Sequence, residues 1–166
     1  MDNFTAAGHT TREVKQMKLT QKESTLLKDM KNQEQICADK YERGAESAVD
    51  PQLKKLFRKL AAIERRHYDT LTKIESGTVP KLSGAKTQAP KITAKYGAKN
   101  TADKQNDCFL CGDALATEKH ASSLYDTCVF EFTQENVRQV LNLIQKQEQE
   151  HGKMLYDYMK ANNMAA

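Results

Sequence analysis

Residues 148–151 of the chain read Glu148-Gln-Glu-His151, and residues 64–67 read Glu64-Arg-Arg-His67. Side chains three positions apart share one face of a helix, so each stretch pairs a carboxylate with an imidazole. The two leading glutamates, at 64 and 148, are 84 residues apart. Each is preceded, 30 residues earlier, by another glutamate, namely Glu34 and Glu118. The chain therefore repeats one arrangement of four carboxylates and two imidazoles.

This set of side chains is typical of a carboxylate-bridged di-metal site. In a four-helix bundle, such a site takes one Glu from each of two helices and a Glu-x-x-His from each of the other two. Four buried carboxylates need compensation, and two divalent cations would balance their charge. We expect these ligands to be Glu34, Glu64, His67, Glu118, Glu148 and His151. The alternative is a hydrogen-bonded, partly protonated cluster that holds no metal.

A tyrosine follows each of the two earlier glutamates by seven residues. These tyrosines, Tyr41 and Tyr125, lie two helical turns from Glu34 and Glu118. We expect them to hydrogen-bond the ligands or to act as redox-active phenols.

The apolar residues recur in steps of three and four over four segments, which predicts four amphipathic helices. Thr20-Gln-Lys-Glu23 is a capping box that starts the first helix, and Asp50-Pro51 ends it and starts the second, which ends near Gly77. We expect the third helix to begin at Asp107 and the fourth to follow Thr133. The expected inward positions are Leu27, Met30, Glu34, Cys37, Tyr41, Gly44 and Ala48; Leu53, Phe57, Leu60, Glu64, His67, Leu71 and Ile74; Cys111, Ala114, Glu118, Ala121, Tyr125, Cys128 and Phe132; and Val137, Leu141, Ile144, Glu148, His151, Leu155 and Tyr158.

Residues 76–106 have no such periodicity and predict a flexible, basic crossover. Residues 76–107 contain six lysines and two aspartates, a surplus equal to the chain's net charge of +4. A helix of about 25 residues is about 37 Å long, which a crossover of this size can span. The sequence therefore predicts an all-α, ferritin-like four-helix bundle over residues 20–164, made of two antiparallel helical hairpins joined by a long crossover. Residues 1–19 are expected to form a mobile tail.

Composition excludes several other classes of protein. The chain has 166 residues, four cysteines and no tryptophan. No apolar run is long enough to span a membrane. The N-terminus lacks the pattern of a signal peptide, so we expect synthesis in the cytoplasm and reduced thiols. The basic crossover lacks aromatic or helical support for nucleic-acid binding, which we do not expect.

The remaining cysteines and histidines carry weaker signals. Cys108 and Cys111 have the spacing of half a metal site, but no second pair follows. Cys37 and Cys128 fall on inward positions and are expected in the core. The other two histidines, His9 and His120, are expected on the surface.

The chain also resembles the coat F domain family of endospore-forming bacteria over residues 19–164. In the first half the resemblance rests on the stretch from Leu19 through Asp50-Pro-Gln-Leu-Lys-Lys-Leu-Phe to His67. The second half is more similar, with Thr117-Glu-Lys-His-Ala-Ser-Ser-Leu-Tyr, Asn136-Val-Arg-Gln, Gln147-Glu-Gln-Glu-His-Gly-Lys and Tyr156-Asp-Tyr-Met. The resemblance implies a ferritin-like bundle located in the spore coat, with other coat proteins as partners. Homodimer formation is left open.

Two functions follow from this resemblance. The first is a structural protein of the spore coat that retains a di-metal site. The second is a di-iron or di-manganese oxidoreductase acting on peroxide or oxygen, because the wider ferritin-like group includes rubrerythrins and manganese catalases. Iron or manganese is the expected metal in either case. Iron storage is disfavoured, because nothing in the sequence indicates a cage-forming surface.

Overall fold

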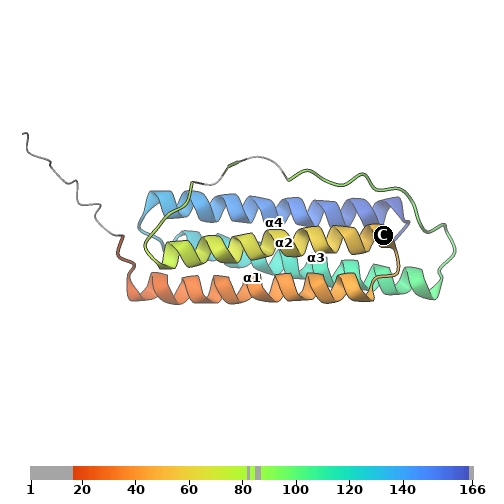
Figure 1. Ribbon diagram of the computed structural model, residues 1–166, viewed down its shortest axis with the longest axis horizontal. Helices are drawn as coiled ribbons and strands as arrows, with labels where there is room; N and C mark the ends of the chain where they lie inside the picture. Colours follow the sequence, from red (N-terminus) through yellow and green to blue (C-terminus); the bar gives the residue numbers. More distant parts are fainter. Residues whose placement is uncertain (1–16, 82, 85–86, 165–166) are drawn as a thin grey trace, which may run out of the picture.

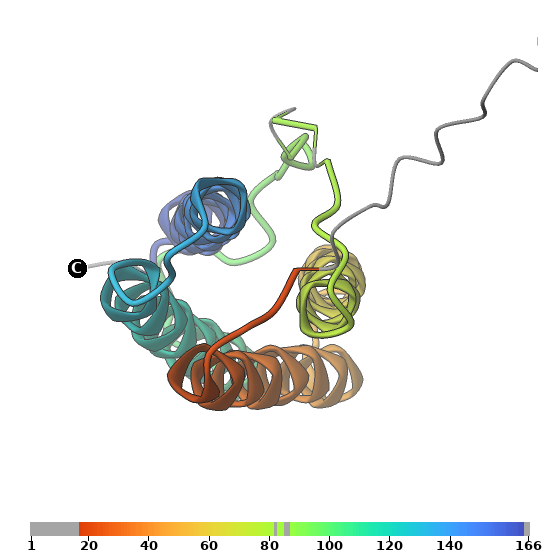
Figure 2. The ribbon, with the colours of Figure 1, turned by 90° about the vertical axis from the view of Figure 1, so that its left-hand side faces the viewer.

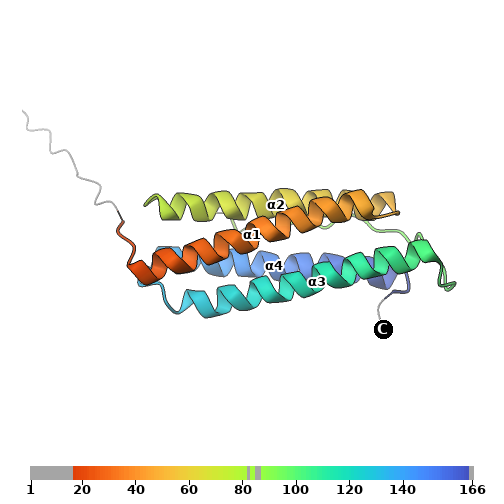
Figure 3. The ribbon, with the colours of Figure 1, turned by 90° about the horizontal axis from the view of Figure 1, so that it is seen from below.

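The computed structural model describes residues 17–81, 83–84 and 87–164. Within these ranges the chain contains four helices and no strand: α1 (Gln21–Ser47), α2 (Pro51–Glu75), α3 (Ala102–Val129) and α4 (Glu135–Ala161). The helices run side by side as an elongated bundle (Figure 1). Helix α1 packs mainly on α2, and α3 mainly on α4 (Figures 2 and 3). The predicted ferritin-like bundle of two antiparallel hairpins joined by a long crossover is confirmed.

Local capping defines the start of α1 and the turn between α1 and α2. Thr20 and Glu23 form the predicted capping box at the start of α1, where the Thr20 side chain accepts from the Glu23 backbone N–H. Asp50 accepts from the Gln52 N–H at 2.9 Å, and Pro51 takes the first helical position of α2. Pro suits this position because its missing N–H would have no intrahelical partner there.

The expected start of α3 at Asp107 is wrong. Helix α3 begins at Ala102, and Thr101 caps it by accepting from the Lys104 N–H at 3.3 Å. The crossover between α2 and α3 is therefore shorter than expected. The sequence signal was incomplete, because Thr101 is followed three residues later by Lys and not by the Glu of a capping box.

The crossover runs along the outside of the bundle and returns the chain to the end from which α2 started (Figure 1). Two polar side chains of the helical hairpins hold its second half. Gln52 accepts from the Thr93 N–H at 3.0 Å, and Asn162 accepts from the N–H groups of Lys95 and Tyr96 at 2.7 and 3.0 Å.

Two buried carboxylates tie each hairpin to the turn of the other. Asp107 of α3 accepts from the Val49 N–H at 2.8 Å in the α1–α2 turn, and Glu23 of α1 accepts from the Thr133 N–H at 2.8 Å in the α3–α4 turn. Burial opposes ionisation of Glu23, but hydrogen bonds from Thr133 and Thr20 outweigh it and lower the pKa of Glu23 below 4.5. The ionised Glu23 is therefore part of the folded structure at neutral pH.

The core consists of two apolar clusters, one towards each end of the bundle. One contains Phe57, Leu60 and Tyr158, and the other contains Leu71 and Ile144. All the inward positions expected from the sequence are buried. The polar residues of the expected metal site occupy the positions between the two clusters along each helix, so the site lies near mid-bundle and is sealed by apolar packing on both sides.

Candidate metal centre

All six side chains expected as ligands converge at the middle of the bundle. Each is at most 3% exposed. Helix α1 supplies one glutamate, α3 supplies one glutamate, and α2 and α4 each supply a glutamate and a histidine one turn apart: Glu34, Glu118, Glu64 with His67, and Glu148 with His151. Helix periodicity alone places them there, because each lies on the inward stripe of its helix.

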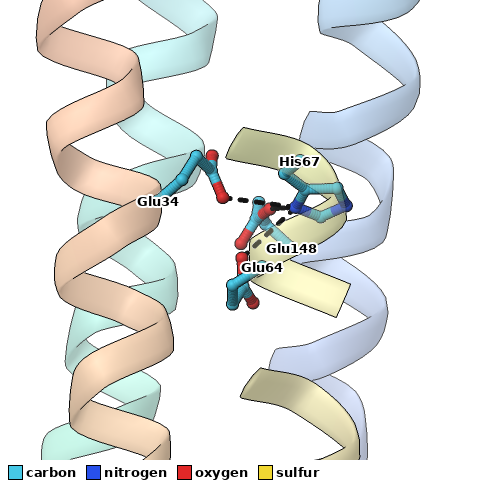
Figure 4. Close-up of side chains that lie close together, drawn as sticks. All are labelled: Glu34, Glu64, His67 and Glu148. Atoms are coloured by element: carbon cyan, nitrogen blue, oxygen red, sulfur yellow. Dashed lines mark hydrogen bonds and ion pairs between the residues drawn. The ribbon is translucent and has the colours of Figure 1, made fainter. Parts of the chain in front are cut away.

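Four of these side chains form a first group around His67. One atom from each of Glu34, Glu64, His67 and Glu148 lies within 4.8 Å of the others. The His67 Nδ1 atom is 3.3 Å from Glu34 Oε2, 3.2 Å from Glu64 Oε2 and 2.9 Å from Glu148 Oε1 (Figure 4). One imidazole nitrogen and three carboxylates facing one point form a donor set suited to iron, manganese or zinc.

A second group surrounds His151. It consists of Glu64, Glu118, Glu148 and His151, again with one atom from each lying within 4.8 Å of the others. The His151 Nδ1 atom is 2.7 Å from Glu64 Oε1 and 3.6 Å from Glu118 Oε1. Glu64 and Glu148 belong to both groups, as bridging carboxylates of a di-metal centre would. The two imidazole rings are stacked with their centroids 5.8 Å apart.

Many polar atoms of the cluster are buried without a hydrogen-bond partner. They are Glu34 Oε2, Glu64 Oε1, Glu118 Oε2, both carboxylate oxygens of Glu148 and both ring nitrogens of His151. Some of these atoms lie close to one another but lack the geometry of a hydrogen bond. Leaving such atoms unpaired costs about 1–3 kcal/mol each, and more when they are charged. Metal coordination would satisfy them, so the donor set fits two cations.

Burial and interactions with neighbouring charges give the carboxyl groups of the cluster different pKa values. Burial raises the pKa of Glu34 to about 7. Burial and then the charges of Glu64 and Glu34 raise the pKa of Glu148 well above 4.5. Glu64 behaves oppositely: burial opposes its ionisation, but His151 and His67 hold its pKa below the usual range. Without metal, the cluster therefore retains protons on part of its carboxylates.

The carboxylates in turn raise the pKa of both imidazoles. Burial alone would lower the pKa of His67, but its contacts with carboxylates, Glu148 foremost, raise the pKa well above 6.5. Burial would also lower the pKa of His151, but its contacts with Glu118 and Glu64 have the larger effect and raise the pKa to about 9. Metal binding requires the neutral imidazole, so ions would displace protons from this cluster.

The two expected tyrosines contact the cluster across the bundle. The Tyr41 hydroxyl of α1 donates to Glu118 of α3, and the Tyr125 hydroxyl of α3 donates to Glu34 of α1. Each tyrosine therefore holds the glutamate of the opposite helix and not the one on its own helix. Both hydroxyls fix the orientation of a carboxylate that faces the centre.

One functional side chain had no signal in the sequence. Gln147 Oε1 lies 2.8 Å from His67 Nε2. In the arrangement where Nε2–H donates to this oxygen, the Nδ1 lone pair of His67 is directed at the carboxylates, ready for a cation. Gln147 follows no spacing rule relative to His67, because the two residues lie on different helices, α4 and α2.

The four cysteines and His120 lie outside the two candidate metal-binding groups. Among the described residues, the two candidate metal-binding groups contain no cysteine. Cys37, Cys111 and Cys128 are buried thiols, and Cys108 is half-buried. His120 is exposed as expected, and His9 lies outside the described residues.

Comparison with known families agrees with this geometry. Residues 106–166, which contain α4 and all but the first turn of α3, match the model of the Coat F domain. This second part of the chain is therefore similar to the Coat F domain. Residues 5–75 match the rubrerythrin model, so the first half of the chain is similar to a ferritin-like family. The first half of the sequence, which resembles the coat F family, thus matches the rubrerythrin model and not the Coat F model. No curated protein and no solved structure matches the chain. Among the described residues, no helix has the length and hydropathy required for a membrane span.

Proposed function

We propose that this protein is a structural component of the spore coat whose bundle holds a carboxylate-bridged di-metal centre. One observation carries the metal site: two overlapping donor groups share Glu64 and Glu148 and leave buried oxygen and nitrogen atoms unpaired. A purely structural bundle would gain stability if these positions were apolar, because burying unpaired charges costs several kcal/mol.

Each ligand has a distinct role in this proposal. Glu34 and Glu118 would each contribute a carboxylate to one donor group, and Glu64 and Glu148 would contribute to both. His67 and His151 would bind through Nδ1, the ring nitrogen that faces the carboxylates in both cases. Two bound iron or manganese ions would supply Lewis acidity and redox capacity. The protein would keep the ligands oriented and the surroundings dry.

Location in the spore coat is supported by the Coat F domain match over residues 106–166. Other coat proteins are the proposed partners, and self-association into a homodimer is part of the same hypothesis. The experiment is to isolate spores, to separate their coat fraction and to detect the chain there with an antibody.

A di-iron or di-manganese oxidoreductase is the second candidate. It is favoured by the rubrerythrin match over residues 5–75 and by two phenols in contact with the cluster, Tyr41 and Tyr125. Turnover of hydrogen peroxide by the metal-loaded protein would establish this function, and its absence would leave the structural role.

The metal site itself is tested by elemental analysis of protein purified without chelators from cells supplied with iron and manganese. We expect two ions per chain, and a loss of both in Glu64→Gln, because this residue belongs to both groups. Glu150→Gln is the matched control. The Glu150 carboxylate accepts from the Thr87 N–H at 3.0 Å and takes no part in the cluster, so this variant should keep both ions.

The regular offset between the two hairpins supports a further part of the proposal, that the bundle arose by duplication of one hairpin. The ligands, the two tyrosines and the two buried carboxylates that tie the turns, Glu23 and Asp107, all recur after 84 residues. A position where the two hairpins carry different side chains therefore indicates a place where the functions of the two hairpins differ.

A further inference from the structure

We infer that divalent cations reach the centre through a pocket between α3 and α4, which is open because position 152 is a glycine. This inference rests on the proposed di-metal site. The pocket has a volume of about 500 Å³ and is lined by residues of both helices, including Glu118 and Glu148. It is thus a surface pocket whose lining includes two of the expected ligands.

The two ligands that line this pocket are buried, and three of their carboxylate oxygens form no hydrogen bond. Glu118 is 3% exposed and Glu148 is 1% exposed. Glu118 Oε2 and both carboxylate oxygens of Glu148 have no hydrogen-bond partner. A cation that entered the pocket would meet these oxygens before any other atom of the centre had to move.

The charge of the lining favours cations. Asp126 adds a carboxylate to those of Glu118 and Glu148, against a single ammonium group, that of Lys119. Serine hydroxyls and glutamine amides make up most of the other lining groups and offer neutral oxygens to a partly hydrated ion. An excess of acidic over basic groups in the lining raises the local concentration of cations and their rate of entry.

Two other pockets near the centre lack these properties. The pocket between α2 and α4 is lined by Lys59, Arg66 and Lys73 against Asp69, so its charge repels cations. It reaches the centre only at His67, whose Nε2 is already paired with a glutamine. The pocket between α1 and α3, of about 240 Å³, contains no expected ligand in its lining. Of these three pockets, the one between α3 and α4 is the one that fits an incoming cation.

The first hairpin shows why the glycine matters. Gly152 follows Tyr68 by 84 residues, and Leu115 follows Lys31 by the same interval. In the first hairpin, Lys31 lies over the Tyr68 ring, 5.1 Å from its centroid. The first hairpin therefore has a stacked lysine–tyrosine pair at the positions that correspond to Leu115 and Gly152. In the second hairpin a Cβ added at Gly152 would lie 3.4 Å from Leu115 Cδ1, and both residues line the pocket.

The test is the rate at which the metal-free protein takes up Co²⁺, followed by stopped-flow absorbance of the bound ion. Gly152→Tyr, which copies the side chain of the first hairpin, should slow uptake about tenfold or more while the final stoichiometry stays the same. Gly152→Ala should be close to wild type, because one methyl group fills little of the pocket.

Asp126→Asn tests the same route without added bulk. It should slow uptake about threefold at low ionic strength, and the difference should vanish near 1 M salt, where the Debye length is about 3 Å. Asp113→Asn is the matched control, because it removes an aspartate from the lining of the α1–α3 pocket. Its uptake rate should equal that of the wild type.

The outcomes separate this inference from the function on which it rests. If the wild-type protein binds no Co²⁺, the di-metal proposal fails. If all variants bind two ions at the wild-type rate, the metal site stands and the entry route is refuted. Slower uptake in Gly152→Tyr and Asp126→Asn, with Asp113→Asn unchanged, supports the route.

Discussion

Replacing His151 with alanine should remove one bound ion and leave the other. The His151 Nδ1 atom belongs to the second donor group alone, whereas Glu34, Glu64, His67 and Glu148 form the first group without it. An ion present at a hundred times its dissociation constant stabilises the folded state by about 2.7 kcal/mol. The wild-type protein should therefore gain about 5 kcal/mol from two ions, and His151→Ala about half of that. In a chain of this size 1 kcal/mol shifts Tm by roughly 2–4 °C, so the variant should lose about 5–11 °C of its metal-dependent gain.

The assay is thermal unfolding followed by circular dichroism, with Mn²⁺ and again with a chelator. The quantity compared is the difference in Tm between these two conditions within each variant, so that any effect of the substitution on the metal-free fold cancels. Glu150→Gln again serves as the control and should keep the full difference. The reasoning is refuted if wild type melts at one temperature in both conditions, or if His151→Ala keeps the whole gain.

Four further predictions concern the surroundings of the centre and the fold. Tyr125→Phe should weaken metal binding about 10–100-fold in a chelator competition, because it removes a hydrogen bond to a ligand, whereas Tyr158→Phe at the end of the bundle should leave binding unchanged. Glu23→Gln should destabilise the protein in urea unfolding above about pH 4.5, and the difference from wild type should disappear as the pH falls through the lowered pKa of Glu23, where the wild-type side chain is also neutral. Cys108 should react with a thiol reagent before the three buried cysteines, and equal rates for all four would contradict the packing described. Trypsin should cut first within residues 81–99, where the four lysines that the structure describes are exposed and lie outside the helices, and primary cleavage inside a helix would count against a flexible crossover.

Helical periodicity sufficed to predict that the six expected ligands are buried. A side chain on the inward stripe of a long helix has little freedom in where it points, so spacing along each helix determined which side chains face the bundle interior. All the inward positions that the same reasoning predicted between Leu27 and Tyr158 are buried, although other positions, such as Leu56 and Met154, are buried as well. The sequence could predict this much because the relevant constraint is local and repeats every three or four residues.

Contacts between helices could not be predicted in the same way. The expectation that Tyr41 and Tyr125 contribute near the ligands is consistent with their hydrogen bonds, but their partners lie on the opposite helix. Asp107 was expected to open a helix, and instead it binds the backbone of a turn 57 residues away. Which residues of two helices lie opposite each other depends on the offset of one helix along the other, and periodicity within a helix contains no information about this offset.

The two donor groups differ in the hydrogen bonding of their histidines, although the spacing of their ligands in the sequence is the same. His67 Nε2 is paired with Gln147, while neither ring nitrogen of His151 has a hydrogen-bond partner. The residue 84 positions before Gln147 is Ile63, which has no polar side-chain atom to offer. A partner on the outer nitrogen fixes the tautomer of an imidazole and makes it a stronger ligand. Because this partner is present in one half and absent in the other, the first donor group should bind its ion more tightly, even though both groups contain three carboxylates and one histidine.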